Sequence, residues 1–229
     1  MESRSLKIIR ILMRRYPQRG RGEVASTDAR RPFEVMVSAI ISQRNRDEVT
    51  EKVAGELLGK ANTPAKMLKL GRAGITKTIR SANFYKTKAK HIHEAAKTIV
   101  KNFDGKMPTT RTELMQLPGV GGKTADIVLM YGFGIPSIAI DTHVQVVSQR
   151  LDWTKEKEPE KIRADLHKLF PASMRGHVNI LLVEFGKEFC RMHLPRCYAC
   201  PVEKLCPYPG KNLRAPGKKK LRAAKRWRP

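Results

Sequence analysis

Four cysteines lie within one 17-residue segment near the C-terminal end of the sequence, in the pattern C-x6-C-x2-C-x5-C. They are the only cysteines of the chain: Cys190, Cys197, Cys200 and Cys206. Thiolates are soft ligands, and four of them in so short a segment can surround one zinc ion or one iron–sulfur cluster. The sequence therefore predicts a metal centre held by these four side chains.

Zinc and an iron–sulfur cluster remain alternatives on spacing alone. Zinc ribbons usually carry two C-x2-C pairs, and this segment has one, formed by Cys197 and Cys200. Two disulfides would be strained in so short a loop, and the N-terminus lacks the continuous apolar stretch of a secretion signal. These features disfavour disulfides and leave the choice between the two metal centres open.

A glycine-rich loop that ends in a lysine occupies residues 117–124, with the sequence LPGVGGKT. Glycines let the backbone turn tightly and approach a ligand, and the N–H groups at the start of the following helix can bind an anion. No strand is expected before the loop, which argues against a nucleotide-binding P-loop. The pattern predicts a phosphate-binding turn between two helices, and the alternative is a helix corner whose glycines serve the turn alone.

Amphipathic helices are expected to position both motifs. Proline at a first helical turn marks the helices that begin at Pro32 and Pro64, and Thr110 with Glu113 forms a capping box before the glycine-rich loop. No segment has the alternation typical of a strand. The sequence therefore predicts an all-α fold, with helices over residues 32–42, 47–58, 64–71, 86–102, 111–117, 123–131, 142–150, 159–170 and 175–189.

Length and composition indicate an ordinary globular protein. The chain has 229 residues, of which 41% are hydrophobic, so it can bury one large core or two small ones. No apolar run reaches the roughly 18 residues that a membrane span needs. We therefore expect a cytoplasmic protein with no membrane partner.

The charge points to nucleic acid as the partner. The chain carries 46 Lys and Arg against 21 Asp and Glu, a formal net charge of +25. The C-terminal residues 211–229 hold nine of these cations, no acid and no apolar period, which predicts a basic flexible tail. Without them the chain keeps 37 cations against 21 acids, a net +16, so the basic character is not confined to the tail.

Three features, in this order, make the chain resemble the endonuclease III family of DNA glycosylases. They are the hairpin LPGVG-x-K-TA, an aspartate 18 residues after its lysine, Asp141 in AIDTH, and the terminal cysteine pattern. The similarity extends from about Pro32 to Cys206 and includes the segments ISQ at 41–43 and NFYKTKA at 83–89.

The resemblance implies a helix-hairpin-helix DNA glycosylase fold with two domains. One is a six-helix barrel over residues 24–135, whose helix-hairpin-helix motif spans about 110–131. The other joins residues 1–23 to 136–210 and binds a 4Fe–4S cluster, which decides the metal question in favour of iron. Residues 211–229 remain outside as the tail.

The resemblance also implies the catalytic residues. Lys123 attacks the sugar C1′ carbon, displaces the base and forms a Schiff base from which β-elimination follows. Because a lysine amine has a pKa of about 10.4 in solution, the site must lower that pKa by desolvation or by neighbouring positive charge. Asp141 stabilises the positive charge that develops on the sugar. Asp141 also directly precedes a helix, so an N-cap is its structural alternative.

The DNA contacts implied by the resemblance lie in the hairpin and in two other segments. The hairpin glycines Gly119, Gly121 and Gly122 hold a backbone phosphate, and Val120 packs between the hairpin helices. Gln43 and Phe84 fill the gap left by an extruded nucleotide, although an aliphatic residue is more usual at the position of Phe84. The alternatives are that Gln43 only ends a helix and that Phe84 belongs to the core.

The implied function is that of a bifunctional DNA glycosylase and AP lyase of base excision repair. It acts as a monomer on double-stranded DNA with damaged bases, oxidised pyrimidines above all, or with abasic sites, and it associates with a prokaryotic nucleoid. The alternatives are a glycosylase for oxidised guanine or for mismatched uracil, thymine or adenine, and a non-enzymatic helix-hairpin-helix DNA-binding protein. Lys123 argues against relatives that lack lyase activity, because they replace this lysine.

Overall fold

The computed structural model describes residues 3–17 and 31–215. Within these ranges the chain is helical and has no strand, which confirms the predicted all-α class. Among the helices so described, none is both long enough and apolar enough to cross a membrane.

The chain divides into two compact units. The central unit comprises Arg21–Ala139 with Phe170–Gly176, and the terminal unit comprises Met1–Gly20, Ile140–Leu169 and His177–Pro229. The functional roles assigned to the two predicted domains remain predictions, and the predicted boundary at residues 23 and 24 lies outside the described residues.

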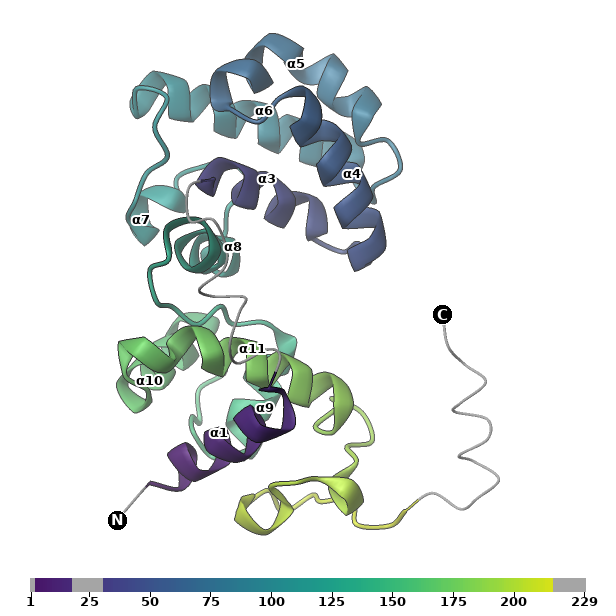
Figure 1. The fold of residues 1–229 in the computed structure, drawn as a ribbon, viewed down its shortest axis with the longest axis vertical. Helices are drawn as coiled ribbons and strands as arrows, with labels where there is room; N and C mark the ends of the chain where they lie inside the picture. Colours follow the sequence, from purple (N-terminus) through teal and green to yellow (C-terminus); the bar gives the residue numbers. More distant parts are fainter. Residues whose placement is uncertain (1–2, 18–30, 216–229) are drawn as a thin grey trace. The chain divides into compact units, whose positions relative to one another are not determined.

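The central unit is built around one apolar helix. Its elements are α3 (Pro32–Ser42), α4 (Asp47–Lys60), α5 (Pro64–Thr78), α6 (Tyr85–Asn102), α7 (Arg111–Leu114), α8 (Gly122–Ile127) and a π-helical turn (Val128–Gly132) (Figure 1). Helix α3 contacts α4, α6, α8 and the π-helical turn. Its sequence PFEVMVSAIIS is apolar on most sides, as expected of a helix that is surrounded by others.

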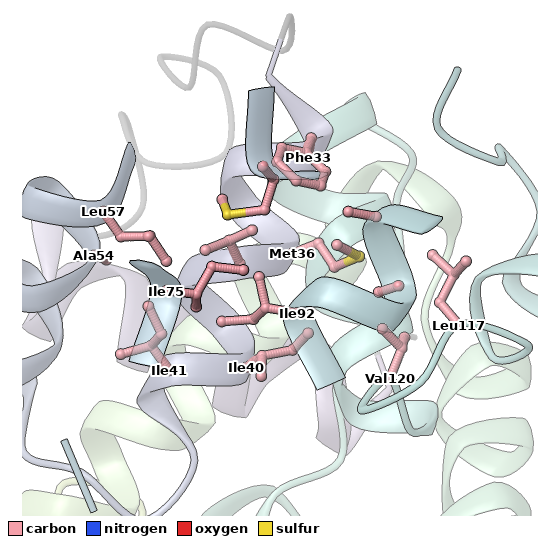
Figure 2. Packing of buried hydrophobic residues seen from close by; sticks show 14 of the residues in the cluster. Phe33, Met36, Ile40, Ile41, Ala54, Leu57, Ile75, Ile92, Leu117 and Val120 are labelled. Atoms are coloured by element: carbon pink, nitrogen blue, oxygen red, sulfur yellow. The ribbon is translucent and has the colours of Figure 1, made fainter. Parts of the chain in front are cut away.

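The core of the central unit includes the glycine-rich hairpin. Figure 2 shows Met36, Ile40 and Ile41 of α3 together with buried residues from α4, α5, α6 and the hairpin. Leu117 and Val120 belong to this same cluster. Burial of these two side chains stabilises the hairpin against the core and so fixes its position within the unit.

The terminal unit contains α1 (Arg4–Arg15), α9 (Thr142–Arg150), α10 (Pro159–Leu169) and the part of α11 (Ala172–Glu188) from His177 onward. Two 3-10 turns, Cys197–Ala199 and Glu203–Leu205, follow. Helix α1 is tied to α11 at Glu188, which accepts a hydrogen bond from Tyr16 Oη at 2.7 Å and pairs with Arg15.

Most helix bounds agree with the sequence within a few residues, and α3 and α9 agree at both ends. The predicted helix end at Gly71 is present as a break in helical geometry, with φ 71° at Gly71, but a second helical stretch that the sequence did not predict follows at once and takes α5 to Thr78. Resumption brings Ile75 into the core, where it is fully buried. Helix α7 stops at Leu114, short of the predicted residue 117, and α1 was not predicted.

Candidate functional site

The capping box predicted at the entry of the hairpin is present. Thr110 Oγ1 accepts from the Glu113 amide at 3.3 Å, and Glu113 Oε2 accepts from the Thr110 amide at 3.3 Å.

The hairpin turn itself depends on Gly119. Gly119 has φ 83°, a region that glycine adopts without strain. A Cβ atom at Gly119 would lie 2.8 Å from Cβ of His91 on α6. Glycine therefore permits both the turn and the close packing against α6.

A buried ion pair anchors the second hairpin helix. Asp126 in α8 is 1% exposed, and Arg111 Nε of α7 donates to both of its carboxylate oxygens at 3.2 Å. Ser137 Oγ donates to Asp126 Oδ1 at 2.6 Å. These charge-assisted bonds lock α7 to α8, because leaving either charge unpaired inside the unit would be costly.

Lys123 is the second residue of α8 and is exposed. Of the two means by which the sequence expects the site to favour a neutral amine, desolvation and neighbouring positive charge, the free chain does not provide the first, because Lys123 is not buried. Gly121 caps α8 with φ −93°, and a Cβ atom there would meet nothing within 4 Å. The hairpin therefore presents Lys123 and an open backbone surface at the same helix end.

Gln43 and the hairpin lie together. Gln43 is the C-cap of α3, and its side-chain amide donates to the Gly119 carbonyl at 3.1 Å. Its main chain is held as well, because Lys88 Nζ donates to the carbonyls of Gln43 at 2.6 Å and Ile41 at 2.7 Å. Lys88 is 4% exposed, and burial lowers the pKa of its amine. Gln43 thus does end a helix, at a position fixed from two sides.

Phe84 is 59% exposed, so the alternative that it belongs to the core is wrong. It caps the start of α6 in the left-handed region at φ 57°. The guanidinium carbon of Arg44 lies 5.5 Å from the centre of its ring. Sequence reasoning missed Arg44, since no sequence signal links two residues 40 positions apart.

Asp141 belongs to the terminal unit, whereas Lys123 belongs to the central unit. Asp141 caps α9 and accepts a hydrogen bond from the Val144 amide at 2.8 Å, so its structural alternative is confirmed. The side chain is half-buried and keeps access to solvent. Nearby, His143 packs closely on α11, since a Cβ atom at Gly186 would lie 2.7 Å from His143 Nδ1.

The four cysteines of the predicted metal centre lie together in the terminal unit. Together they line one pocket of about 370 Å³, part of it open to solvent. None of them forms a disulfide, and all four are half-buried. Burial raises the pKa of the Cys200 thiol to about 12 and also raises the pKa of Cys190. Across the described ranges, no three Cys, His, Asp or Glu side chains gather as ligands of one metal ion.

Arg150 at the end of α9 holds the cysteine segment, a role that the sequence did not indicate. Its guanidinium donates to the carbonyls of Cys190 at 3.3 Å, Arg191 at 2.7 Å and Met192 at 2.8 Å. It also lies over the ring of Tyr208, 4.9 Å from the centre. One side chain therefore fixes the chain on both sides of the pocket.

Two residues assigned to the tail belong structurally to the cysteine segment. Lys211 Nζ donates to the Glu203 carbonyl at 2.9 Å and to its carboxylate at 2.7 Å. The Asn212 carbonyl accepts from the Tyr198 amide at 3.1 Å. The remaining residues of the predicted tail from 216 onward lie outside the described residues.

Comparison with known proteins agrees with this architecture. The sequence matches the model of the HhH-GPD superfamily base excision DNA repair proteins over residues 37–172. It is 37% identical to endonuclease III of Thermotoga maritima over 202 residues, which are 88% of this chain and 92% of that protein. It is 36% identical to endonuclease III of Escherichia coli K12 over 177 residues, 77% of this chain and 84% of that protein.

Solved structures have the same fold. A trapped endonuclease III–DNA covalent intermediate superposes with a TM-score of 0.78 at 29% identity, covering 96% of this chain and all of that one. A thermostable thymine-DNA glycosylase reaches the same TM-score at 21% identity, covering 90% of this chain and 96% of that one, which is a likeness of fold alone.

These matches define a base excision DNA repair protein with a helix-hairpin-helix glycosylase fold. Within the HhH-GPD superfamily, the chain belongs to the endonuclease III family and is a DNA glycosylase.

Proposed function

We propose that this chain is a bifunctional DNA glycosylase and AP lyase that acts on oxidised pyrimidines in double-stranded DNA and on abasic sites. The observation that carries the proposal is Lys123, an exposed amine at the hairpin end of α8. The similarity to a trapped covalent complex of endonuclease III with DNA supports a nucleophile on the protein. A monomer suffices for this chemistry.

Lys123 is the proposed nucleophile. Its amine bonds to C1′ of the deoxyribose while the bond from C1′ to the base breaks, and the departing base takes up a proton. Ring opening gives a Schiff base, and loss of a C2′ proton then expels the 3′ phosphate. The amine must be neutral to attack C1′, and desolvation in the complex with DNA or neighbouring positive charge would favour that form.

Asp141 is the proposed carboxylate that stabilises positive charge on the sugar and assists proton transfer. Its hydrogen bond to Val144 fixes one oxygen and leaves the other available. A cap held in one orientation suits electrostatic stabilisation, since the charge needs no reorganisation during the reaction.

The proposed DNA contacts are Gln43, Phe84 and the hairpin residues Gly119, Val120, Gly121 and Gly122. The hydrogen bond from Gln43 to Gly119 places the first and third of these segments side by side. Exposure of the Phe84 ring leaves it available to stack on a base. Nucleotide extrusion requires such side chains, because an empty gap in the duplex is unstable.

We further propose that Cys190, Cys197, Cys200 and Cys206 hold a 4Fe–4S cluster. Four thiols on the wall of one pocket, in a chain of the endonuclease III family, support a cluster held by these side chains. Burial raises the pKa of the Cys190 and Cys200 thiols, so binding of iron by these two side chains must release protons. The cluster would order the segment without taking part in the proposed sugar chemistry.

The domain roles and the location in the cell complete the proposal. The six-helix barrel carries the hairpin and the nucleophile, and the terminal segments carry the cluster. Because the substrate is chromosomal DNA, the protein associates with the nucleoid in the cytoplasm of a prokaryote.

The test is borohydride trapping on duplexes that each contain one lesion. Parent protein should form a covalent complex with DNA containing an oxidised pyrimidine or an abasic site. Lys123→Gln should lose trapping but keep lesion-specific binding, whereas Lys52→Gln, which removes an exposed amine from α4, should trap like the parent. Undiminished trapping by Lys123→Gln would show that another amine is the nucleophile. Trapping confined to oxidised guanine would correct the substrate.

A further inference from the structure

One stretch of the chain, residues 57–93, contains no acidic residue. It carries nine of the 46 Lys and Arg, and all 21 Asp and Glu lie elsewhere in the sequence. The stretch includes α5 and the first half of α6, which lie side by side (Figure 1). Eight of the nine cations are exposed, and the ninth is the buried Lys88. The surface of this helix pair is therefore positive, with no acid in the same stretch to balance it.

Three of these cations line one hollow beside α5 and the start of α6. The hollow measures about 1000 Å³, part of it open to solvent, and its wall includes Arg72, Lys77, Arg80 and Tyr85. We call it the α5–α6 hollow. Arg72 is the first residue after the break at Gly71, so the second helical stretch of α5 supplies this wall.

The three cations of the hollow have their donors available. Within residues 3–17 and 31–215, no acidic residue lines the hollow and no carboxylate pairs with any of the three. Nearby, by contrast, Lys60 donates to Thr78 Oγ1 and Lys66 donates to Asn62 Oδ1, both at 3.2 Å. Like charges around one hollow repel each other, and a bound anion relieves that repulsion. Two guanidinium groups and an ammonium suit phosphate oxygens in particular.

The position of the hollow relates it to the proposed DNA contacts. Tyr85 on its wall directly follows Phe84, whose ring is exposed. The hairpin meets α6 at His91, six residues further on, where Gly119 packs closely. Six residues correspond to about 9 Å along a helix and about 240° around it. The hollow and the hairpin therefore lie on different sides of α6, and DNA that runs from the hairpin over Phe84 meets the hollow on one flank of the lesion.

Resting on the proposed function, we propose that Arg72, Lys77 and Arg80 bind backbone phosphates of the same DNA duplex, on one flank of the damaged nucleotide beyond Phe84. Phosphate contacts fix the register of a protein on DNA and add affinity, but they carry no sequence information. Each phosphate that they neutralise adds about 0.9 to the dependence of log affinity on log salt. The hollow lengthens the DNA site and takes no part in the chemistry at Lys123.

The experiment compares DNA affinity between the parent and the triple variant Arg72→Gln, Lys77→Gln, Arg80→Gln. Each of two duplexes carries one uncleavable abasic-site analogue, with a short arm on one side and, on the other, a long arm of about 20 base pairs, two helical turns. The long arm is 5′ of the analogue in one duplex and 3′ in the other. Raising the salt from about 50 mM to about 200 mM should shrink the affinity advantage of the parent about 3.5-fold for each phosphate contact that the variant has lost. The effect should appear with one duplex and be absent with the other, because the hollow lies on one flank.

The matched control removes the same charge from the terminal unit. It replaces three exposed lysines, Lys155, Lys161 and Lys168, with glutamine. The control should show no difference between the two duplexes. Equal thermal midpoints would show that both triple variants are folded, and borohydride trapping at saturating protein should be parental in both.

Two results would overturn the inference. Equal salt dependence of the parent and the Arg72, Lys77, Arg80 variant on both duplexes would show that these cations do not touch the DNA bound at the lesion. Equal losses on both duplexes, shared by the control, would reduce the effect to overall charge. A parent that traps lesion-containing DNA and gives either result overturns this inference alone, whereas a parent that traps no lesion overturns the proposed function as well.

Discussion

Asp141 caps α9 and is also the proposed catalytic carboxylate, and substitution can separate the two roles. Asp141→Asn keeps an oxygen that accepts from the Val144 amide, so the cap and the fold should survive. It removes the negative charge, so excision of an oxidised pyrimidine should slow by orders of magnitude. On a preformed abasic site the base has already left, and the defect should be much smaller. Single-turnover rates on the two substrates measure the difference.

Asp141→Ala is the companion variant, because it removes both the charge and the cap. It should lower the free energy of unfolding by about 1 kcal/mol relative to Asp141→Asn, with no faster excision. Equal slowing on damaged and on abasic DNA by Asp141→Asn would place the carboxylate in the lyase step instead.

Residues that act through local sequence were predictable, and residues that act through space were not. The cap at Asp141 and the box at Thr110 depend on neighbours three residues away, so the pattern alone indicated them. Arg44 and Arg150 gain their partners only after folding. The exposure of Lys123 also depends on how α8 packs, which no motif specifies.

At the scale of elements, the two hairpin glycines should respond differently to alanine. Gly119→Ala forces a side chain into the left-handed region and against His91, and should lower the free energy of unfolding by about 1–2 kcal/mol or more. Gly121 has an ordinary φ and open space around its Cα atom, so Gly121→Ala should change the free energy of unfolding by no more than about 0.5 kcal/mol. Urea unfolding followed by circular dichroism tests both.

DNA binding supplies the contrasting measurement. The Cβ atom of Gly121→Ala would stand where the proposed phosphate contact forms, so affinity should fall although stability does not. Equal losses of stability in the two variants would mean that both glycines serve only the turn.

The cysteine segment should depend on the clamp made by Arg150. Arg150→Gln removes the donors to the carbonyls of Arg191 and Met192 and the stacking on Tyr208. Outer interactions of this kind commonly change metal affinity about tenfold or more. The variant should lose iron to a chelator about tenfold faster, measured as the decay of absorbance at about 400 nm.

Lys204→Gln is the matched control, because it removes one exposed cation from the same segment. It should lose iron at the parental rate. If both variants lose iron faster than the parent, the positive charge of the segment and not the Arg150 clamp retains the metal. A parent protein that contains about one zinc and no iron would refute the cluster itself.

The order of the helices was predictable because caps, prolines and apolar periods are local signals. The residues at which the helices begin and end were less predictable. A second helical stretch of α5 follows the break at Gly71, and it places Ile75 in the core, a tertiary contact that no local pattern reveals. The same holds for α1, whose buried face needs a partner elsewhere in the chain.

For the whole molecule, the net charge of +25 predicts strongly salt-dependent DNA binding. Residues 216–229 carry seven Lys or Arg. Their deletion should flatten the dependence of log affinity on log salt, by about 0.9 for each DNA phosphate that these cations neutralise in the parent protein. Trapping at saturating protein should be unchanged. The deletion begins beyond Lys211 and Asn212, so it spares their bonds to the cysteine segment.

Replacing those seven cations with glutamine removes their charge and keeps the length of the chain. The substituted protein should show the same dependence of log affinity on log salt as the deletion variant. Loss of trapping in either variant would show that these residues belong to the active structure, and an unchanged slope would show that they do not touch DNA.

Lys88 has a consequence for the chemical reactivity of the chain. Its amine is buried and donates to two carbonyls, so a water-borne acylating reagent reaches it only when the loop at Gln43 opens. The rate at which Lys88 becomes acylated therefore measures how often that loop opens. Lys88 is therefore a natural reporter of how often the end of α3 separates from α6.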